Sequence, residues 1–365
     1  MPKEKSLKEW IEQIVGSKAS DLHLGEGVCP QMRKDGDLVK LADVPFTKEA
    51  MKSLIMEYLS AEKFKEFEQK RELDYSFGIA GLGRFRANLY FQRGAIGCAL
   101  RALPEEPMTF EQIGFPMDVA ENLLLRPSGL VLVTGATGSG KTTTLAAMVN
   151  HINAHQNVRI VTVEDPIELV FKDKKALISQ REVGSDTHAF SEALRHVLRQ
   201  DPDVILIGEM RDLETIEIAL TCAETGHLVF ATLHTPDAVQ SINRTIDVFP
   251  AAQQQQVRVQ FSFVLQAVIS QQLLPRTGGG LALAAEILIA TPAIRTLIRE
   301  SKSHQIYSSI QMGQKEGMRT LNMSLAQLVK ANRISREDAY MRSSDVQELE
   351  RLLADARATA KGRMG

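Results

Sequence analysis

The sequence predicts an α/β fold of two domains, the second of them built around a mostly parallel β-sheet. The chain has 365 residues, about twice the length of a typical domain. From Leu130 onward, short runs of apolar and β-branched residues alternate with helical stretches, which is typical of a parallel sheet. Pro104 and Pro107 interrupt the chain before that region. We therefore expect a linker at these prolines and a separate N-terminal domain.

The N-terminal region, residues 1–103, mixes helix-like and strand-like patterns. Met1–Val15 has the apolar spacing of an amphipathic helix and lacks the continuous apolar stretch of a signal peptide. Lys48–Gln69 is expected to form one helix, because its apolar residues recur on one side. Strands are predicted at Arg84–Tyr90 and Ala95–Leu103. These elements predict a mixed α+β domain.

The second domain is expected to cover residues 113–365, after a linker at 104–112. Leu213–Thr225 is predicted to be a helix because its apolar residues share one face, and Gly226 suits its C-cap. The tail after Gln347 is charged and ends in small residues, so we expect a helix that frays. Strands of the parallel sheet are predicted at Leu130–Thr134, Arg159–Val163, Val204–Ile207 and Leu228–Leu233.

Composition and charge exclude several classes of protein. Lys and Arg total 43 and Asp and Glu total 45, a formal net charge of −2, whereas a general nucleic-acid binder needs clustered cations. Hydrophobic residues make up 44% of the chain, which excludes a disordered or collagen-like protein. No run of the sequence is long and apolar enough to span a bilayer. Because Cys29, Cys98 and Cys222 form no CxxC pair, we expect neither a disulfide framework nor a structural zinc module, and reduced thiols fit the cytoplasm.

A phosphate-binding loop is predicted between a strand and a helix. Gly135–Thr142 matches G-x-x-x-x-G-K-[ST] in that context. Its glycines let backbone N–H groups turn inward around phosphate oxygens, and the helix N-terminus adds partial positive charge. We expect Lys141 to reach the β- and γ-phosphates of ATP and the Thr142 hydroxyl to bind Mg²⁺. The residues expected to bind the nucleotide are Gly135, Ala136, Thr137, Gly138, Ser139, Gly140, Lys141, Thr142 and Thr143.

Two acidic residues and a histidine follow further predicted strands. Glu164, Glu209 and His234 each come shortly after one, and ligands gather at the carboxyl ends of parallel strands. Hydrolysis needs one carboxylate to orient water and another to hold Mg²⁺ through its waters. We assign the first role to Glu164 and the second to Glu209, and we expect His234 to sense the γ-phosphate. His227 lies at the other end of its strand, where it either reaches an interface or caps the preceding helix.

Together these segments resemble one family, the secretion-type hexameric ATPases that power type II secretion and type IV pili. Leu198–Asp212 is similar to the Walker B signature of that family, in which Glu replaces Asp. Glu164–Glu168 resembles its Asp box, and Thr225–His234 resembles its His box. The resemblance implies a PAS-like N-terminal domain joined to a RecA-like ATPase domain, with six copies forming a ring. By position, Arg86 and Arg101 correspond to the arginine fingers of the family, whose planar guanidinium groups suit charge developing on the γ-phosphate.

Within the family, the chain is similar to the type IV pilus retraction ATPases. It begins almost at Ala19–Leu24 and lacks the paired CxxC zinc module of many assembly and secretion ATPases. Ala293–Glu300 resembles the retraction motif, with Thr296 where Asn is usual, and its Arg295 is a candidate for coupling hydrolysis to retraction. The resemblance implies a cytoplasmic motor at the inner face of the cytoplasmic membrane that couples ATP hydrolysis to pilus disassembly, retraction and twitching motility. Its implied partners are an inner-membrane platform protein and, as a further candidate, a paralogous retraction ATPase.

Three alternative functions stay open. One is a pilus assembly or type II secretion ATPase, against which the missing zinc module argues. Another is an accessory subunit that binds nucleotide without turnover, although Lys141, Glu164 and Glu209 are all in place. The third is a RecA-like nucleic-acid translocase, whose ring would need a basic channel bearing aromatic residues. Because aromatic residues are only 5% of the chain, we expect no nucleic-acid partner.

Overall fold

The computed structural model describes residues 5–17, 19–34 and 37–361, and it divides into two compact units. Unit 1 comprises Met1–Glu106 and Pro166–Val170, and unit 2 comprises Pro107–Asp165 and Phe171–Gly365. The division after Glu106 falls inside the linker expected at 104–112. The end of that segment is already helical, because Thr109 and Gln112 form a capping box that begins α4 (Phe110–Ile113).

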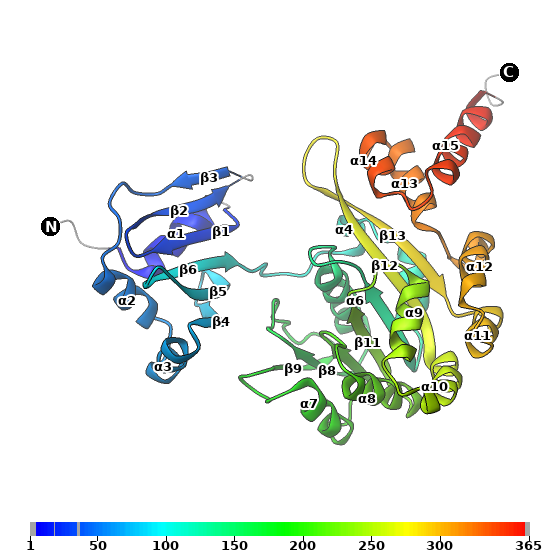
Figure 1. Cartoon of the computed structure of the whole chain (residues 1–365), viewed down its shortest axis with the longest axis horizontal. Helices are drawn as coiled ribbons and strands as arrows, with labels where there is room; N and C mark the ends of the chain where they lie inside the picture. Colours follow the sequence, from blue (N-terminus) through cyan, green and yellow to red (C-terminus); the bar gives the residue numbers. More distant parts are fainter. Residues whose placement is uncertain (1–4, 18, 35–36, 362–365) are drawn as a thin grey trace. The chain divides into compact units, whose positions relative to one another are not determined.

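Unit 1 is built on a six-stranded antiparallel sheet of order β3-β2-β1-β6-β5-β4. Helices α1, α2 and α3 bury their apolar faces against it, which forms one hydrophobic core (Figure 1). The helix expected within Met1–Val15 is present as α1, and the first four residues of that range lie outside the described residues. The elements are α1 (Leu7–Gly16), β1 (Asp21–Gly25), β2 (Val28–Lys34), β3 (Asp37–Lys40), α2 (Lys48–Met56), α3 (Ala61–Lys70), β4 (Glu72–Ile79), β5 (Gly83–Gln92) and β6 (Ala95–Ala102).

The single helix predicted over Lys48–Gln69 is wrong, because the structure has two helices there. α2 ends at Met56, and α3 begins after Ser60, whose side chain accepts the N–H of Lys63. A Ser at this position offers the backbone its own cap and so favours a new start. Leu59, between the two helices, is buried. The apolar pattern therefore runs through the break and conceals it.

Unit 2 contains a seven-stranded sheet of order β13-β12-β7-β11-β10-β8-β9, in which all neighbours are parallel except β12 and β13. The expected α/β class with a mostly parallel sheet is confirmed. The four predicted strands are its centre, where burial on both faces favours continuous apolar runs. β9, β12 and β13 were not predicted. The strands are β7 (Gly129–Thr134), β8 (Arg159–Glu164), β9 (Leu177–Glu182), β10 (Val204–Ile207), β11 (Leu228–Leu233), β12 (Leu265–Pro275) and β13 (Leu281–Ile289).

Helices cover both faces of the unit 2 sheet. Along β7, Leu130 and Leu132 join the core with α7–α12, whereas Val131 and Val133 join the core with α4–α6. The helix predicted at Leu213–Thr225 is confirmed as α8. The remaining helices are α5 (Met117–Leu124), α6 (Lys141–His155), α7 (Phe190–Val197), α8 (Leu213–Glu224), α9 (Ala238–Asp247), α10 (Ala251–Val264), α11 (Pro292–Arg299), α12 (Ile306–Met312), α13 (Leu321–Lys330), α14 (Arg336–Arg342) and α15 (Val346–Lys361).

The last three helices pack on the extended hairpin formed by β12 and β13, as Figure 1 shows. A buried carboxylate connects the last of them, α15, with α12 and α13. Glu348 on α15 accepts hydrogen bonds from the Tyr307 hydroxyl at 2.6 Å, from Gln311 Nε2 at 2.7 Å and from Asn322 Nδ2 at 2.6 Å. These partners come from α12 and α13, so one side chain connects three helices. The expected helical tail is present through Lys361, and residues 362–365 lie outside the described residues.

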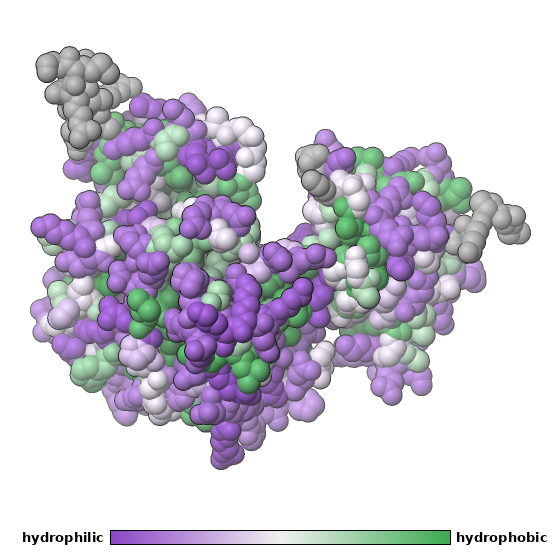
Figure 2. Space-filling view, turned by 180° about the vertical axis from the view of Figure 1, so that it is seen from behind, coloured by the Kyte–Doolittle hydropathy of each residue, from purple (hydrophilic) through white to green (hydrophobic). Residues whose placement is uncertain are grey.

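The surface is mostly polar where it can be seen, as expected when the apolar side chains form internal cores. The face seen in Figure 2 is mostly hydrophilic, with hydrophobic side chains in small patches. Across the part of the chain that the structure describes, no helix combines the length and the apolar character needed to cross a bilayer.

Glu286 on β13 is a buried acid with a pH-dependent effect on stability. The residue is only 4% exposed, and its Oε1 accepts the N–H of Ala238, the first residue of α9, at 2.8 Å. Burial raises the pKa of Glu286 to about 7, and the charges of Asp237 and Glu348 act in the same direction, although the Ala238 hydrogen bond lowers it. The folded chain therefore holds a proton that the unfolded chain releases.

We expect the free energy of unfolding to fall as pH rises from about 4.5 to about 7, because the folded carboxyl has the higher pKa. Glu286→Gln keeps an acceptor for Ala238 and removes the titration, so this variant should be the more stable at pH 8 by on the order of 1–3 kcal/mol. Urea unfolding at several pH values measures the difference. Glu316→Gln, which removes an exposed carboxylate, is the control, and an unchanged pH profile in Glu286→Gln would contradict this account.

Candidate active site

The candidate site lies at the carboxyl ends of four neighbouring parallel strands. In the order β7-β11-β10-β8, the strands are followed by the phosphate loop, by His234, by Glu209 and by Glu164 as the last residue of β8. Their ends are nearly level, since Thr134 pairs with Leu233 in the strand register. The chain therefore brings the residues predicted from four separate segments to one edge of the sheet.

The phosphate loop has the tight backbone that its glycines predict. Gly135, Gly138 and Gly140 have φ values of 140°, 78° and 89°, which side chains disfavour. A Cβ on Gly135 would lie 2.5 Å from both the Gln271 carbonyl oxygen and Ser139 Oγ. Only glycine fits there, because β12 passes directly against the loop. Gly140 then leads into α6 as its N-cap residue.

Two side chains of the loop have donors suited to phosphate oxygens. Lys141 is buried, and its Nζ donates to the carbonyl oxygens of Gly135 at 2.8 Å and Ala136 at 3.0 Å. Ser139 Oγ is buried and has no hydrogen-bond partner among the described residues. A buried hydroxyl without a partner is costly, and a phosphate oxygen would supply the missing acceptor. The loop therefore fits the phosphates of a nucleotide.

Glu209 is held as an anion by two neighbours. Its carboxylate oxygens lie 2.7 Å from the Arg211 guanidinium and 3.4 Å from His234 Nε2. Partial burial raises the pKa of Glu209, but the interactions with Arg211 and His234 outweigh it and leave this pKa below its ordinary value. Glu209 and His234, both expected at the carboxyl ends of strands, are therefore neighbours in the structure. Arg211 was not predicted, although it follows Glu209 by two residues on the same loop.

Glu164 is oriented by its own strand and by the next one. Thr162 Oγ1 donates to Glu164 Oε1 at 2.6 Å, and Gln180 Nε2 on β9 donates to the same oxygen at 3.1 Å. Gly208, just before Glu209, approaches this strand end closely. Its N–H donates to the Val163 carbonyl oxygen at 2.8 Å, and a Cβ added to it would lie 3.3 Å from the Glu164 Cα. The backbones that carry the two predicted carboxylates are thus in contact.

His227 lies at the opposite end of β11, where it contacts the end of α8. Its Nδ1 is 3.0 Å from the Cys222 carbonyl oxygen and 3.2 Å from Thr225 Oγ1. Both partners belong to the last turn and C-cap of α8. The sequence left two roles open for His227, at an interface or as a cap of the preceding helix, and these contacts match the cap.

Arg86 and Arg101 belong to unit 1, where they stand directly opposite each other on β5 and β6. Arg101 Nε is 2.8 Å from an Asp21 oxygen, and Arg86 lies 3.7 Å from an Asp74 oxygen. The side chain of Arg101 is 67% exposed despite its ion pair. The arginine-finger role of this pair stays a prediction.

The guanidinium groups of Arg295 and Arg299 on α11 both pack against the end of α10. Arg295 donates to the carbonyl oxygens of Ser262, Phe263 and Ala290. Arg299 lies over the Phe263 ring. Long cationic side chains can reach around a helix to the unpaired carbonyls at the end of a neighbour. These contacts fix α11 in place.

Gln271 on β12 is a site residue that sequence reasoning missed. It is 1% exposed, and its Nε2 donates to Thr144 Oγ1 on the first turns of α6 at 2.7 Å. Its main-chain oxygen is the atom that closes the space beside Gly135. The one available signal was a glutamine within an apolar run. Without the strand order, nothing connected that residue with the phosphate loop.

A phosphate loop between a strand and a helix, with carboxylates at the ends of adjacent parallel strands, defines a P-loop nucleotide-binding protein. The chain belongs to the type II/IV secretion system protein family, which it matches over residues 1–280. This finding confirms the family resemblance inferred from the motifs.

The chain is similar to characterised members along most of its length. The "Type IV pilus retractation ATPase PilT" of Pseudomonas aeruginosa is 51% identical over 321 residues, 88% of this chain and 93% of that protein. A twitching motility protein of Neisseria gonorrhoeae is 44% identical over 321 residues, 88% of this chain and 86% of that protein. The crystal structure of the pilus retraction motor PilT with bound ADP has a TM-score of 0.89 at 50% identity, and the match covers 95% of this chain and 100% of that one. The chain is an ATPase of this family.

We expect the contact between Gln271 and Thr144 to position the phosphate loop. Gln271→Leu and Thr144→Val should each raise the KM for ATP by roughly 5- to 10-fold, because each leaves a buried group unpaired. In the double variant, the KM should rise by less than the product of the two single increases, since all three variants lose the same hydrogen bond. Steady-state kinetics measure this. Gln272→Leu, at the next and less buried position of β12, is the control, and independent effects in the double variant would exclude the coupling.

Proposed function

We propose that this chain is the ATP-driven motor that retracts a type IV pilus, and that it works as a ring of six copies. The observation that carries the proposal is the assembly of Lys141, Glu164, Glu209 and His234 at one sheet edge, in a chain that is similar to retraction ATPases over most of its length. The chain hydrolyses ATP, and the proposal assigns that energy to pilus disassembly and twitching motility.

The side chains divide the chemistry between them. The phosphate loop and Lys141 bind and orient the β- and γ-phosphates. Glu164, fixed by Thr162 and Gln180, has an oriented carboxylate that can accept a proton from the attacking water. His234 stands beside Glu209, where it responds to the γ-phosphate. Glu209 keeps its negative charge through Arg211.

The same site fits Mg²⁺, which prefers oxygen ligands and keeps several of its waters. The exposed Thr142 hydroxyl and the Glu209 carboxylate are the residues that would hold it, Glu209 through water. When bound, Mg²⁺ neutralises charge on the phosphate oxygens.

The proposals of a six-membered ring and of its partners are supported by the family to which the chain belongs. By position in the sequence, Arg86 and Arg101 correspond to the arginine fingers of the family, and their guanidinium groups suit charge on a γ-phosphate. We assign both arginines to the γ-phosphate at the transition state. We further propose that the ring acts at the inner face of the cytoplasmic membrane on a platform protein of the pilus machine, with a paralogous retraction ATPase as a further partner.

Glu164→Gln should leave ATP binding nearly intact and lower kcat by about 10²-fold or more, because an amide cannot accept the proton of water. Binding of ATP and phosphate release, measured on the same preparation, separate the two steps. Glu217→Gln, which changes an exposed residue of α8, is the control. In cells, Glu164→Gln should give piliated bacteria that do not twitch. Bald cells would instead identify an assembly motor, and undiminished turnover would remove the role of Glu164.

α11 should couple hydrolysis to motion without taking part in chemistry. Leu297 lies beside a groove between α11 and α12 whose lining also includes Thr296 and Met312, and Met312 is 78% exposed. Leu297→Ala should therefore keep most ATPase activity in vitro while cells keep pili and lose twitching. The melting temperature is measured alongside, because Leu297→Ala removes partly buried side-chain atoms, and the cavity that they leave would lower the stability of the fold. Met341→Ala, an exposed change on α14, is the control. A folded variant with full motility would contradict the coupling.

A further inference from the structure

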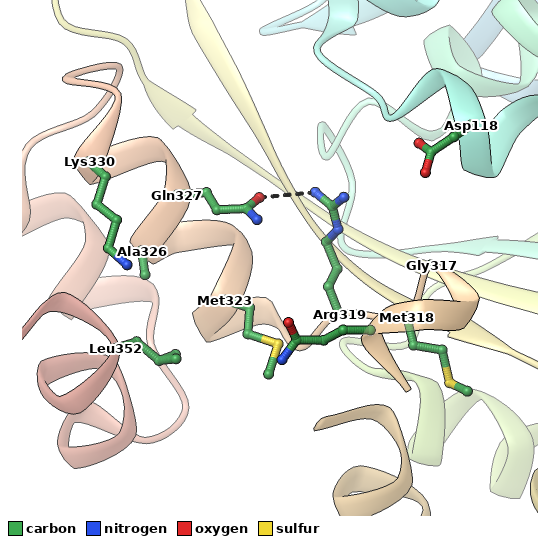
Figure 3. Close-up of a pocket in the computed structure, with 10 residues that line it drawn as sticks. Asp118, Gly317, Met318, Arg319, Met323, Ala326, Gln327, Lys330 and Leu352 are labelled. Carbon is green, nitrogen blue, oxygen red and sulfur yellow. Dashed lines mark hydrogen bonds between the residues drawn. The ribbon is translucent and has the colours of Figure 1, made fainter. Parts of the chain in front are cut away.

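A pocket of about 280 Å³ lies among the C-terminal helices of unit 2. Figure 3 shows side chains from several segments around it, with those of α13 along one wall. None of its residues belongs to the strand-end site described above. The lining consists of Asp118, Gln314, Gly317, Met318, Arg319, Met323, Ala326, Gln327, Lys330 and Leu352.

Arg319 is held firmly at its backbone, and its guanidinium group points into this pocket. Its main chain exchanges two hydrogen bonds with Ile287 of β13, at 2.9 and 3.0 Å. Within the described ranges, its side chain makes one hydrogen bond, from Nη1 to Gln327 Oε1 at 3.3 Å. It forms no salt bridge with any described residue. Burial lowers the pKa of Arg319, and the charge of Asp118 opposes this effect without cancelling it.

The contrast with Arg295 shows how unusual this arrangement is. Arg295 is also partly buried, but its guanidinium donates to three carbonyl oxygens. Among the described residues, Arg319 makes a single long hydrogen bond, so most of its N–H donors have no protein acceptor there. Removing a cation from water is costly unless an anion or several acceptors compensate. Within the described chain, the Gln327 oxygen and the charge of Asp118 compensate only in part, so an anion bound in the pocket would complete the pairing of Arg319.

The surroundings of Arg319 favour an anion with a small carbon skeleton. Lys330 lines the same pocket and adds a second cation, against the one carboxylate of Asp118. A phosphoryl group carries about −1.5 to −2 charges at neutral pH and matches the planar fork of a guanidinium. Met323, Ala326 and Leu352 form an apolar wall beside these polar groups.

We propose that this pocket binds the phosphoryl group of a small organic phosphate, with Arg319 as its fork-shaped partner and Lys330 as the second cation. Gln327 and Gln314 supply further amide donors, and the apolar wall contacts the carbon part of the ligand. None of its lining residues belongs to the ATP site, so binding to this pocket can be measured separately from hydrolysis.

Methionine methyl NMR of the full chain tests this directly, because Met318 and Met323 line the pocket. Glycerol 3-phosphate is the probe and uncharged glycerol its control. We expect saturable shifts of the Met323 methyl signal with the phosphate and none with glycerol. Met341, which is 75% exposed on α14, should not respond. Met148, buried on the phosphate-loop helix, reports binding at the ATP site in the same spectra.

Arg319→Gln should weaken binding of glycerol 3-phosphate about tenfold or more, because it removes a charge-assisted pair. The affinity of Arg319→Lys for glycerol 3-phosphate should lie between those of the wild type and Arg319→Gln, since lysine keeps the charge and loses the planar fork. Lys330→Gln should weaken binding about threefold. Lys315→Gln, an exposed lysine outside the pocket, is the matched control. Retained ATPase activity and an ATP response at Met148 show that each variant is folded.

The proposal fails if Met323 does not respond to glycerol 3-phosphate in the wild-type chain. It also fails if Arg319→Gln and Arg319→Lys bind the probe as tightly as the wild type does. Tighter binding of glutarate than of glycerol 3-phosphate would reassign the pocket to carboxylates and overturn the phosphate specificity. If Arg319→Gln does not fold, Arg319→Lys and Lys330→Gln decide the question, because both retain most of the native packing.

Discussion

The level ends of four buried parallel strands are the constraint on which the site depends. β7, β11, β10 and β8 pair without interruption, so Ile207 at the end of β10 stands beside Ala231 on one side and Val163 on the other. Because both faces of these strands are buried, a slip of one residue would exchange the two cores and carry the following loop with it. The geometry of the candidate site is therefore fixed by hydrophobic packing of the strands that carry its residues.

The loops above these strands are also tied to one another, which turns an edge of a sheet into a defined site. Glu164 and Glu209 leave their strands on backbones that share hydrogen bonds with their neighbours, so neither carboxylate depends on its own loop alone. These hydrogen bonds between loops hold the two carboxyl groups in place without burying them completely. The surrounding donors keep Glu209 ionised. The ties are Gly135 N–H to Leu233 O, Gly208 N–H to Val163 O and Met210 N–H to Thr232 O.

The hairpin of β12 and β13 connects the parts of unit 2. On β12, Gln271 packs against the phosphate loop, and further along the same strand Leu274 enters the core of the C-terminal helices. On β13, Glu286 contacts the start of α9, and Ile287 pairs with the backbone of Arg319. One hairpin thus contacts the nucleotide loop, the segment that follows His234 and the proposed phosphate pocket. A change at any of these places has a short, rigid connection to the others, since strands transmit displacement with little internal flexibility.

Local order in the chain determined the class of fold, the central strands and the phosphate loop, because burial period and glycine spacing are properties of short segments. Lys141 and the strand-end carboxylates could be found for the same reason. The break within 48–69 has a local cause, the cap at Ser60, which the continuous apolar pattern conceals. Tertiary structure alone decided the contact of Gln271 with the loop and the partial burial of Arg295 and Arg319. Each of these depends on which distant element lies alongside. A glutamine or an arginine has the same local pattern whether it meets water, a helix end or a pocket, and only packing between elements distinguishes these environments.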